Sequence, residues 1–299
     1  MDYTYLVPPA FGGKKLGAFL RAGAGLSSSL VRSVKYEPLG LRVNGARAKT
    51  DALLRAGDVV EVRVEEEPVH LSPCAADVPI LYESDDAVVF NKPAGMATHP
   101  TLNYPDGTLA NVWARVLLER GTAGTFRPVN RLDRNTSGLV LAAKGRLAAP
   151  RLAAGARKAY FALVQGCPAA QTGRIDAPVG LADGTIIGRC VRADGAPSVT
   201  DYAVVRRYDG YSLLYVETRT GRTHQIRVHM QYIGHPLLGD SLYGEASPLI
   251  ARHALHCARL WFDEPRTGER VALRCPPPAD MLALTQAADW EVVPEMQKT

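Results

Sequence analysis

The sequence has few cysteines, and none of them stands in a pattern typical of a metal site or a disulfide framework. No two of the five form a C-x-x-C pair, and an odd number fits reduced thiols better than a set of disulfides. The seven histidines show no spacing that indicates a metal triad. We therefore expect no metal, and a reducing, cytoplasmic environment.

Membrane and nucleotide-binding signals are also missing. No apolar run approaches the roughly 18 residues that a bilayer-spanning helix needs. The opening segment 1–5 lacks a basic stretch followed by an apolar one, so we expect no secretory leader. The sequence contains no P-loop, no G-x-G-x-x-G that opens a helix and no H-E-x-x-H. These absences argue against a membrane protein and against an enzyme with a nucleotide cofactor.

Positive charge is concentrated near the N-terminus. Between Lys14 and Asp58 nine Lys and Arg residues stand against three acidic ones, whereas the net charge of all 299 residues is +5. A compact basic segment suggests a polyanionic partner such as nucleic acid. A solvated charged face explains the charge alone equally well.

The same segment has a pattern of its own. The spacing of Leu16, Phe19 and Leu20 predicts a short helix, and residues 40–45 predict a strand that enters an Asn-Gly turn. Residues 14–64 resemble the alpha-L RNA-binding module, with a degenerate second helix. The length predicts about two domains. We expect a small α/β RNA-binding module at 1–65, a linker at 66–79 and a catalytic domain at 80–299.

Short apolar runs bounded by turn residues dominate the rest of the chain. They predict strands at 87–90, 139–141, 160–164 and 213–216, and helical spacing predicts helices at 109–118, 223–233 and 279–288. Strands and helices alternate irregularly, which is typical of the α+β class rather than of a βαβ repeat. We expect a mixed, largely antiparallel sheet with flanking helices.

A polar loop with Asp133 at its centre directly precedes one predicted strand. Arg131 and Arg134 flank this aspartate, and nearby cations hold a carboxyl group in its ionised form, as a nucleophile requires. The alternative is a turn residue that hydrogen-bonds its own backbone, which is common for Asp in such loops.

Two further segments carry unusual side chains. In R-T-G-R-T-H-Q-I-R-V-H-M (219–230), Thr223 is placed to cap a helix whose polar face carries His224 and Arg227, and such a face is usually just solvated. In R-K-A-Y, Lys158 precedes Tyr160 on a predicted strand. A strand tyrosine is more often part of a core, although it is also able to stack on an unpaired base.

Taken together, these segments resemble the RluA-type RNA pseudouridine synthases. The matching stretches, in the order of that family, are NKPAGMATHP (91–100), NRLDRNTSGLVLAAK (130–144), RKAYFALVQG (157–166), TRTGRTHQIRVHMQYIGHPLLGDSLYG (218–244) and LHCARLWF (255–262). The resemblance implies an isomerase without cofactor, which converts specific uridines in structured RNA to pseudouridine. It favours ribosomal RNA over transfer RNA as the substrate, and we expect a monomer.

The resemblance also implies roles for single residues. Asp133 corresponds to the catalytic carboxylate, Tyr160 to the ring stacked on the target base, and Arg227 to the arginine paired with the carboxylate. Arg222 is the alternative for that pairing. The residues expected to contact RNA are Arg131, Arg134, Lys158, Arg222, His224 and Gln225. The chain departs from the family at Asn130, where His is usual, and at Ala196, near which a lysine is common.

Two other classes of protein remain to be weighed. A non-catalytic RNA-binding protein on the same scaffold has no need for the acid in R-L-D. A glycoside-type hydrolase uses a pair of carboxylates, and the motif of Asp133 holds no second acid. Both classes rank behind the synthase.

Overall fold

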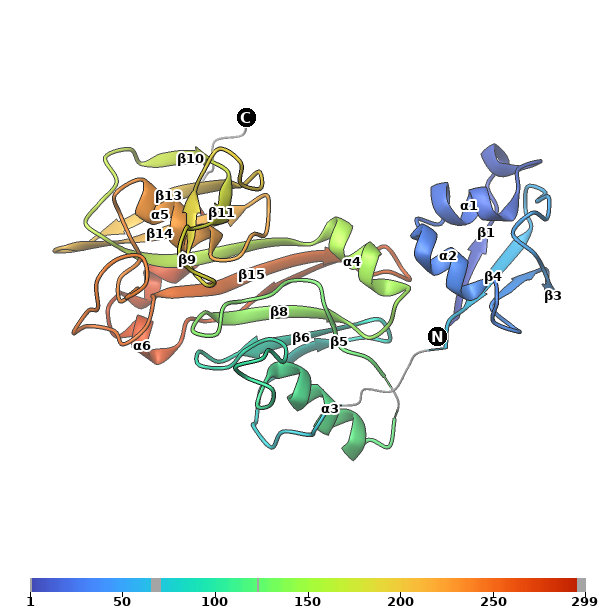
Figure 1. Cartoon of the computed structure of the whole chain (residues 1–299), viewed down its shortest axis with the longest axis horizontal. Coiled ribbons are helices and arrows are strands. Elements are labelled where there is room, and N and C mark those ends of the chain that lie inside the picture. The colour runs from blue at the N-terminus through green and yellow to red at the C-terminus, as the bar shows by residue number, and fades with distance from the viewer. Residues whose placement is uncertain (1, 66–70, 123, 295–299) are drawn as a thin grey trace.

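The computed structural model describes residues 2–65, 71–122 and 124–294 (Figure 1). The N-terminal part forms a four-stranded sheet in the order β1-β4-β2-β3, with two helices packed on it. Its elements are β1 (Asp2–Leu6), α1 (Leu16–Ala22), α2 (Ser28–Val34), β2 (Leu41–Val43), β3 (Ala46–Arg47) and β4 (Val59–Arg63), with a 3-10 turn at Pro9–Phe11. We call this part, residues 2–65, the N-terminal module.

The helix predicted from Leu16, Phe19 and Leu20 and the Asn-Gly turn are both confirmed. Asn44 and Gly45 have positive φ angles of 51° and 79°, as the tight turn between β2 and β3 requires. The side chain of Asn44 also accepts the backbone N–H of Val59 at 2.8 Å, which ties the turn to β4. Strand β1 was not predicted, because its five residues lie outside the segment that carries the helix and turn signals.

The rest of the chain is built on one ten-stranded sheet. Eight strands run in the order β10-β13-β14-β9-β15-β8-β6-β5, while β16 pairs with β15 and β7 with β8. The strands are β5 (Ile80–Glu83), β6 (Ala87–Lys92), β7 (Arg127–Pro128), β8 (Ser137–Ala143), β9 (Arg157–Gln165), β10 (Thr172–Asp176), β13 (Val199–Arg207), β14 (Tyr211–Thr218), β15 (Leu255–Asp263) and β16 (Arg270–Arg274). Among the strand pairs of the described residues only β8–β15 is parallel, so the expected mixed, largely antiparallel sheet is confirmed.

Four helices and a separate hairpin flank this sheet (Figure 1). They are α3 (Leu109–Glu119), α4 (Ala148–Gly155), α5 (Gln225–Tyr232), α6 (Ala279–Leu282) and the pair β11 (Val179–Leu181) and β12 (Arg189–Val191); a 3-10 helix follows at Ala287–Glu291. The expected helix at 279–288 is therefore too long. Helix α6 ends at Leu282. Beyond it, the Thr285 hydroxyl donates to the carbonyl of Met281 and accepts a hydrogen bond from the Trp290 indole.

A glycine allows the parallel strands β8 and β15 to meet at the centre of the sheet. Gly138 has a φ of +110°, and a Cβ atom there would lie 2.2 Å from the carbonyl oxygen of Cys257. Any other residue would push the two strands apart. This close pairing matters for the site, because β8 begins directly after the loop of Asp133, and Cys257 pairs on its other side with Tyr160 of β9.

The segment expected to be a linker, 66–79, is described from residue 71 onward, and 66–70 lie outside the described residues. Its described part follows α3 closely. The side-chain amide of Asn111 donates to the carbonyl of Ser72 at 2.8 Å, and the backbone carbonyl of Asn111 accepts the N–H of Cys74. Val78 belongs to the core of the large sheet. Residues 71–79 thus pack as part of the second domain.

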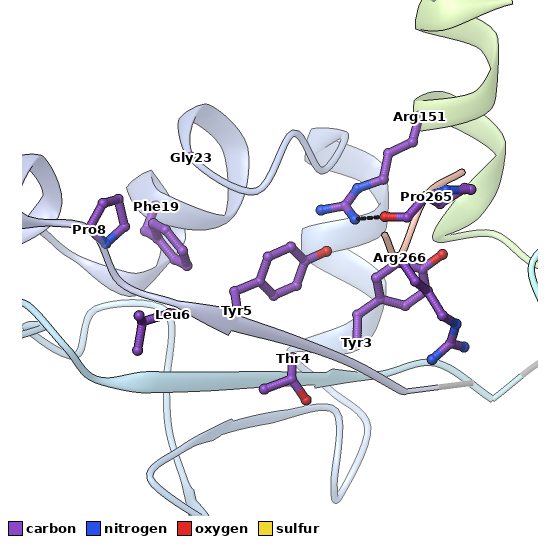
Figure 2. Close-up of a pocket in the computed structure, with 10 residues that line it drawn as sticks. All are labelled: Tyr3, Thr4, Tyr5, Leu6, Pro8, Phe19, Gly23, Arg151, Pro265 and Arg266. Atoms are coloured by element: carbon purple, nitrogen blue, oxygen red, sulfur yellow. Dashed lines mark hydrogen bonds between the residues drawn. The ribbon is translucent and has the colours of Figure 1, made fainter. Parts of the chain in front are cut away.

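The N-terminal module contacts the large sheet through α4 and the turn after β15 (Figure 2). The guanidinium of Arg151 lies about 5 Å from the ring centres of Tyr3 and Tyr5, and donates to the carbonyl of Pro265 at 2.9 Å. Arg266 covers the other side of Tyr3. A cavity of about 540 Å³ remains at this junction.

Within the described part of the chain, no helix is long and apolar enough to cross a bilayer. The same residues contain no group of three or more metal-binding side chains.

Candidate active site

The loop of Asp133 is held rigidly against β8 by a single buried side chain. The amide of Asn130 donates to the carbonyl of Leu139 at 3.1 Å and accepts the N–H of Leu141 at 2.8 Å. Both bonds go to the backbone of the strand that the loop precedes. Asn130, which stands where histidine is usual in the family, therefore fixes the loop to β8 through both polar atoms of its side-chain amide.

The carboxylate of Asp133 makes no hydrogen bond to the described residues of its own loop. The turn is closed by the N–H of Thr136 on the backbone carbonyl of Asp133, so the side chain takes no part in it. The side chain is 24% exposed and lines a cavity of about 210 Å³. That volume is below the roughly 300 Å³ at which pockets for drug-sized ligands begin, and it suits a group as small as one base.

Arg227 of α5 is the cation that contacts this carboxylate. Its Nη1 lies 3.3 Å from Oδ2 of Asp133, and its other edge makes two hydrogen bonds to Asp240, at 2.7 Å and 2.8 Å. Burial works against the charged form of Arg227, but the bonds to Asp240 outweigh it and raise the pKa of the guanidinium. The same pairing lowers the pKa of buried Asp240.

These contacts decide between the two arginines left open by the sequence. Arg222 is exposed, and its Nε lies 3.4 Å from the carbonyl oxygen of Pro197. Within the described residues it has no contact with Asp133. The arginines next to Asp133 in sequence do not supply its counter-charge either. Arg131 is exposed, and Arg134 donates to the carbonyl of Gly95 at 2.9 Å. Among the described residues, neither of these two arginines forms an ion pair with Asp133, whereas Arg227 does.

His224 stands at the start of α5 in a strained conformation. Its φ of +58° is in the left-handed region, which is uncommon for a residue with a side chain. Its Nδ1 shares a hydrogen bond with the hydroxyl of Tyr243 at 2.7 Å, and its Nε2 is 3.9 Å from Asp133. Burial lowers the pKa of the imidazole. The helix begins one residue later, at Gln225, so the prediction that Thr223 caps it is wrong.

Gln225 anchors the basic turn before α5. Its side-chain oxygen accepts the N–H of Arg222 and the hydroxyl of Thr220, and its amide donates to the carbonyl of Val199 and to Thr200. The side chain is buried, and all its polar capacity is used inside the protein. Direct contact between Gln225 and RNA therefore has no support in this structure.

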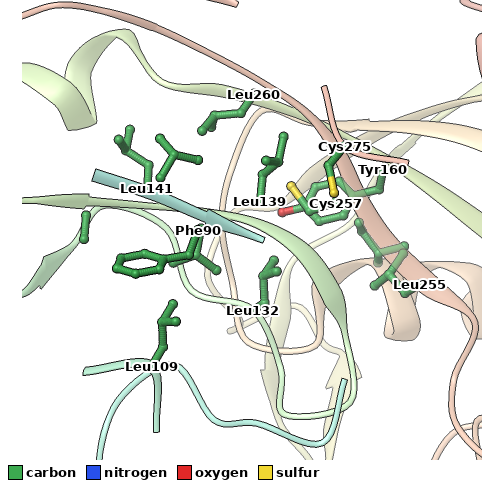
Figure 3. Close-up of a cluster of buried hydrophobic side chains, with 14 of the residues drawn as sticks. Phe90, Leu109, Leu132, Leu139, Leu141, Tyr160, Leu255, Cys257, Leu260 and Cys275 are labelled. Carbon is green, nitrogen blue, oxygen red and sulfur yellow. The ribbon is translucent and has the colours of Figure 1, made fainter. Parts of the chain in front are cut away.

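Tyr160 lies in the apolar core (Figure 3). It is not among the residues that line the cavity of Asp133. Its side chain is 7% exposed, and its hydroxyl faces the thiol of Cys257 on the neighbouring strand. Burial raises the pKa of this hydroxyl far above its usual value, and the charge of Asp133 adds to the effect. Lys158, two residues earlier on the same face of β9, is partly buried.

Two charged residues of the site were missed by sequence reasoning. Asp240 lies in the stretch GHPLLGDSLYG, which matches the family, and its carboxyl group is the feature from which a role in the site could have been predicted. Lys92 is fully buried, and its ammonium group donates to the carbonyls of Met96, Pro93 and Arg134 at 2.7–3.2 Å. Burial lowers the pKa of Lys92 to about 7, against the attraction of Asp133. Lys92 thus ties the loop of Asp133 to the segment after β6.

Comparison with known proteins agrees with this geometry. Residues 86–232 match the family model described as RNA pseudouridylate synthase. The uncharacterized RNA pseudouridine synthase YjbO of Bacillus subtilis is 38% identical over 87% of this chain and 94% of its own length. Ribosomal large subunit pseudouridine synthase D of Haemophilus ducreyi is 34% identical over 83% of this chain and 81% of its own.

A solved structure shares the fold as well. Human RNA pseudouridylate synthase domain containing 1 superposes with a TM-score of 0.56 at 29% identity, over 71% of this chain and 87% of that one. Because YjbO is 38% identical to this chain over 94% of its own length, the two proteins share a family. The chain belongs to the RNA pseudouridine synthase family, whose members are isomerases.

Proposed function

We propose that this enzyme isomerises uridines of large-subunit ribosomal RNA, with Asp133 as its catalytic carboxylate. One observation carries the assignment of Asp133: its carboxylate lines a base-sized cavity, makes no bond to its own loop, and is contacted by a buried arginine that is itself fixed by Asp240. The choice of RNA rests on relatives named ribosomal large subunit pseudouridine synthase D.

The reaction requires few groups. The bond between N1 of uracil and C1′ of ribose breaks, the base turns, and C5 bonds to C1′. The proton on C5 is lost and N1 takes up a proton, so the change is redox-neutral and calls for no cofactor. Asp133 serves either to attack the substrate or to remove the C5 proton, and both tasks fall to its carboxylate, which lies against the guanidinium of Arg227.

The other side chains divide between substrate contact and support. Tyr160 is proposed to meet the uracil ring once the base enters, since a base extruded from its stack is commonly held against an aromatic side chain. We propose that exposed Arg131, Arg134 and Arg222 contact phosphates of the RNA, together with Lys158 and His224. Of these five residues, Arg134 and His224 line the cavity. Gln225 is proposed as a positioning residue for the turn that carries Arg222.

The N-terminal module is proposed to add RNA affinity without taking part in the chemistry. Of its nine basic residues between Lys14 and Arg55, eight side chains are exposed, and only Arg42 forms an ion pair among the residues that the structure describes. Unpaired exposed cations suit the phosphate backbone, and binding through them should weaken steeply with salt. We also propose a cytoplasmic monomer, and the five free cysteines fit a reducing compartment.

The geometry disfavours a hydrolase with two carboxylates. The second acid near Asp133 is Asp240, which is 1% exposed and has both carboxylate oxygens bound to Arg227. The low pKa of Asp240 leaves it no proton to donate near neutral pH.

The proposal is tested by site-resolved mapping of pseudouridine in cells with and without this protein. We expect one or a few uridines of large-subunit ribosomal RNA to lose the modification in its absence and to regain it with the wild-type protein but not with Asp133→Asn. Loss confined to transfer RNA would contradict the choice of substrate. No change at any uridine would contradict the proposed function.

A further inference from the structure

The β11–β12 hairpin lies at the edge of the cavity that contains Asp133. Its two strands form a sheet of their own, apart from the ten-stranded sheet. Val179 and Val191 at its base pack against Val228 of α5 and the ring of Tyr243. In Figure 1 the hairpin strand β11 appears next to α5, the helix that supplies Arg227.

One hydrogen-bonded residue connects the hairpin to the catalytic side chains. The hydroxyl of Tyr243 accepts the backbone N–H of Arg189 on β12 at 2.9 Å and bonds to Nδ1 of His224 at 2.7 Å. His224 in turn faces Asp133. The hairpin is therefore fixed to the same residues that surround the reacting carboxylate.

The tip of the hairpin satisfies its own backbone. The hydroxyl of Thr185 accepts the N–H groups of Ile187 and Gly188, at 3.1 Å and 3.0 Å, and the N–H of Ala182 donates to the carbonyl of Gly188. A tip closed in this way keeps its shape without a partner and presents its side chains outward.

Those side chains are apolar. Ile186 is 87% exposed and Ile187 is 55% exposed, yet Ile187 lines the same cavity as Asp133 and Arg227. Two adjacent isoleucines in solvent are unfavourable, and an exposed apolar group at the mouth of a site usually marks a surface that a ligand covers.

We propose that Ile186 and Ile187 contact the RNA beside the target uridine and keep that uridine turned out of its stack and over Asp133. This inference rests on the proposed function. A uridine that enters the cavity remains joined to its neighbours on both sides, so these nucleotides have to pass the cavity mouth where the isoleucines project. Apolar side chains placed against an opened base step are a known means of holding nucleic acid in a distorted form.

The test compares Ile186→Ser/Ile187→Ser with two controls. Leu118→Ser removes an equally exposed apolar side chain (69%) from α3, and Ile186→Leu/Ile187→Leu keeps the apolar surface of the tip. The substrate is total RNA labelled with [5-³H]uridine from cells that lack this protein. Single-turnover tritium release, binding of the same RNA and the melting temperature are measured for each variant.

We expect the double serine variant to release tritium at least tenfold more slowly than the wild type, with an unchanged melting temperature. Leu118→Ser and the double leucine variant should stay within about twofold of the wild-type rate. A double serine variant as fast as the wild type, or a Leu118→Ser variant equally slow, would overturn the inference and leave the proposed function standing. A wild-type protein that releases no tritium would overturn the proposed function and, with it, this inference.

Discussion

Asp240 holds Arg227 by two parallel hydrogen bonds, at 2.7 Å and 2.8 Å, and so aims the remaining amino group at Asp133, 3.3 Å away. One buried arginine thus lies between two carboxylates that differ in exposure. Asp240, at 1%, is shielded from water, whereas Asp133, at 24%, opens to the cavity. The buried carboxylate fixes the arginine, and the arginine contacts the accessible carboxylate.

Loss of Asp240 should therefore cost both stability and activity. We expect Asp240→Ala to lower the free energy of unfolding by about 3–5 kcal/mol, because one partner of a buried ion pair is left uncompensated. Asp263→Ala is the matched control: its pair with Arg270 is half exposed, and such pairs contribute about 0–1 kcal/mol. Urea unfolding followed by circular dichroism measures both. Equal midpoint shifts for the two variants would contradict the role given to Asp240.

Asn130 should stabilise the loop of Asp133 through its two bonds to β8. In Asn130→Ala the carbonyl of Leu139 and the N–H of Leu141 lose their side-chain partner inside the protein. An unsatisfied buried polar group costs about 1–3 kcal/mol, so we expect a loss in that range. Asn103→Ala, at an exposed turn position, should change stability very little. Thermal and urea unfolding of both variants provide the comparison.

Burial of His256 should make stability depend on pH. Burial lowers the pKa of this imidazole to about 4 in the folded protein, against 6.5 as the ordinary value. Between these values the unfolded chain binds a proton that the folded protein does not, so the free energy of unfolding should rise with pH from about 4 to 6.5. One such group contributes a slope of up to about 1.4 kcal/mol per pH unit.

The variant His256→Gln isolates this contribution. It should reduce the slope of the pH dependence in that window, and the remaining slope belongs in part to His253, whose pKa burial also lowers to about 4. His235→Gln, at a partly exposed position, serves as the control. Urea midpoints measured at half-unit steps of pH give the slopes. A wild-type slope retained in His256→Gln would show that the proton is taken up elsewhere.

The phenol of Tyr160 should matter more for the reaction than for RNA binding. Tyr160→Phe keeps the ring for stacking and removes only the hydroxyl, which is neutral at physiological pH and faces Cys257. We expect a loss of most of the catalytic rate, at least tenfold, with RNA affinity nearly unchanged. Tyr202→Phe, at a similarly buried position on β13, is the control. Full activity in Tyr160→Phe would limit the residue to a ring platform, and full activity in Tyr160→Ala would remove it from the site.

The sequence predicted secondary structure well where that structure depends on neighbouring residues alone. The Asn-Gly turn and the apolar strands at the centre of the sheet need only local propensity and periodicity. The start of α5 was misplaced, because the left-handed His224 is stabilised by Tyr243, nineteen positions further on. Local propensity favoured Thr223 as a cap and contains no information on that contact.

In the candidate site, too, the sequence predicted what local motifs determine and missed what the packing of distant segments determines. Asp133 and Arg227 were predicted from the family resemblance, and the choice between Arg227 on α5 and Arg222 in the turn before it then depended on how α5 packs against the loop of Asp133. Sequence spacing cannot give that orientation, because it follows from how the helix packs. The counter-charge was likewise expected from the neighbours Arg131 and Arg134, whereas an arginine 94 positions away provides it.

Asp133→Asn is the decisive substitution for the proposed chemistry. It keeps the size of the side chain and its ability to accept the hydrogen bond from Arg227, and removes the charge and the nucleophilic oxygen. No other acid is able to take over, because the nearby Asp240 is buried and bound on both oxygens. RNA contacts come mainly from arginines and the N-terminal module, so binding should persist.

We therefore expect Asp133→Asn to be folded, to bind RNA and to be inactive. Tritium release from RNA labelled with [5-³H]uridine measures activity, and a binding titration and a melting curve on the same preparation measure the other two properties. Release near the wild-type rate would refute Asp133 as the catalytic carboxylate. Loss of folding together with activity would favour the interpretation of Asp133 as a turn residue. The structure argues against that interpretation, because the turn is closed by the backbone carbonyl of Asp133 and the N–H of Thr136, a bond that Asp133→Asn leaves intact.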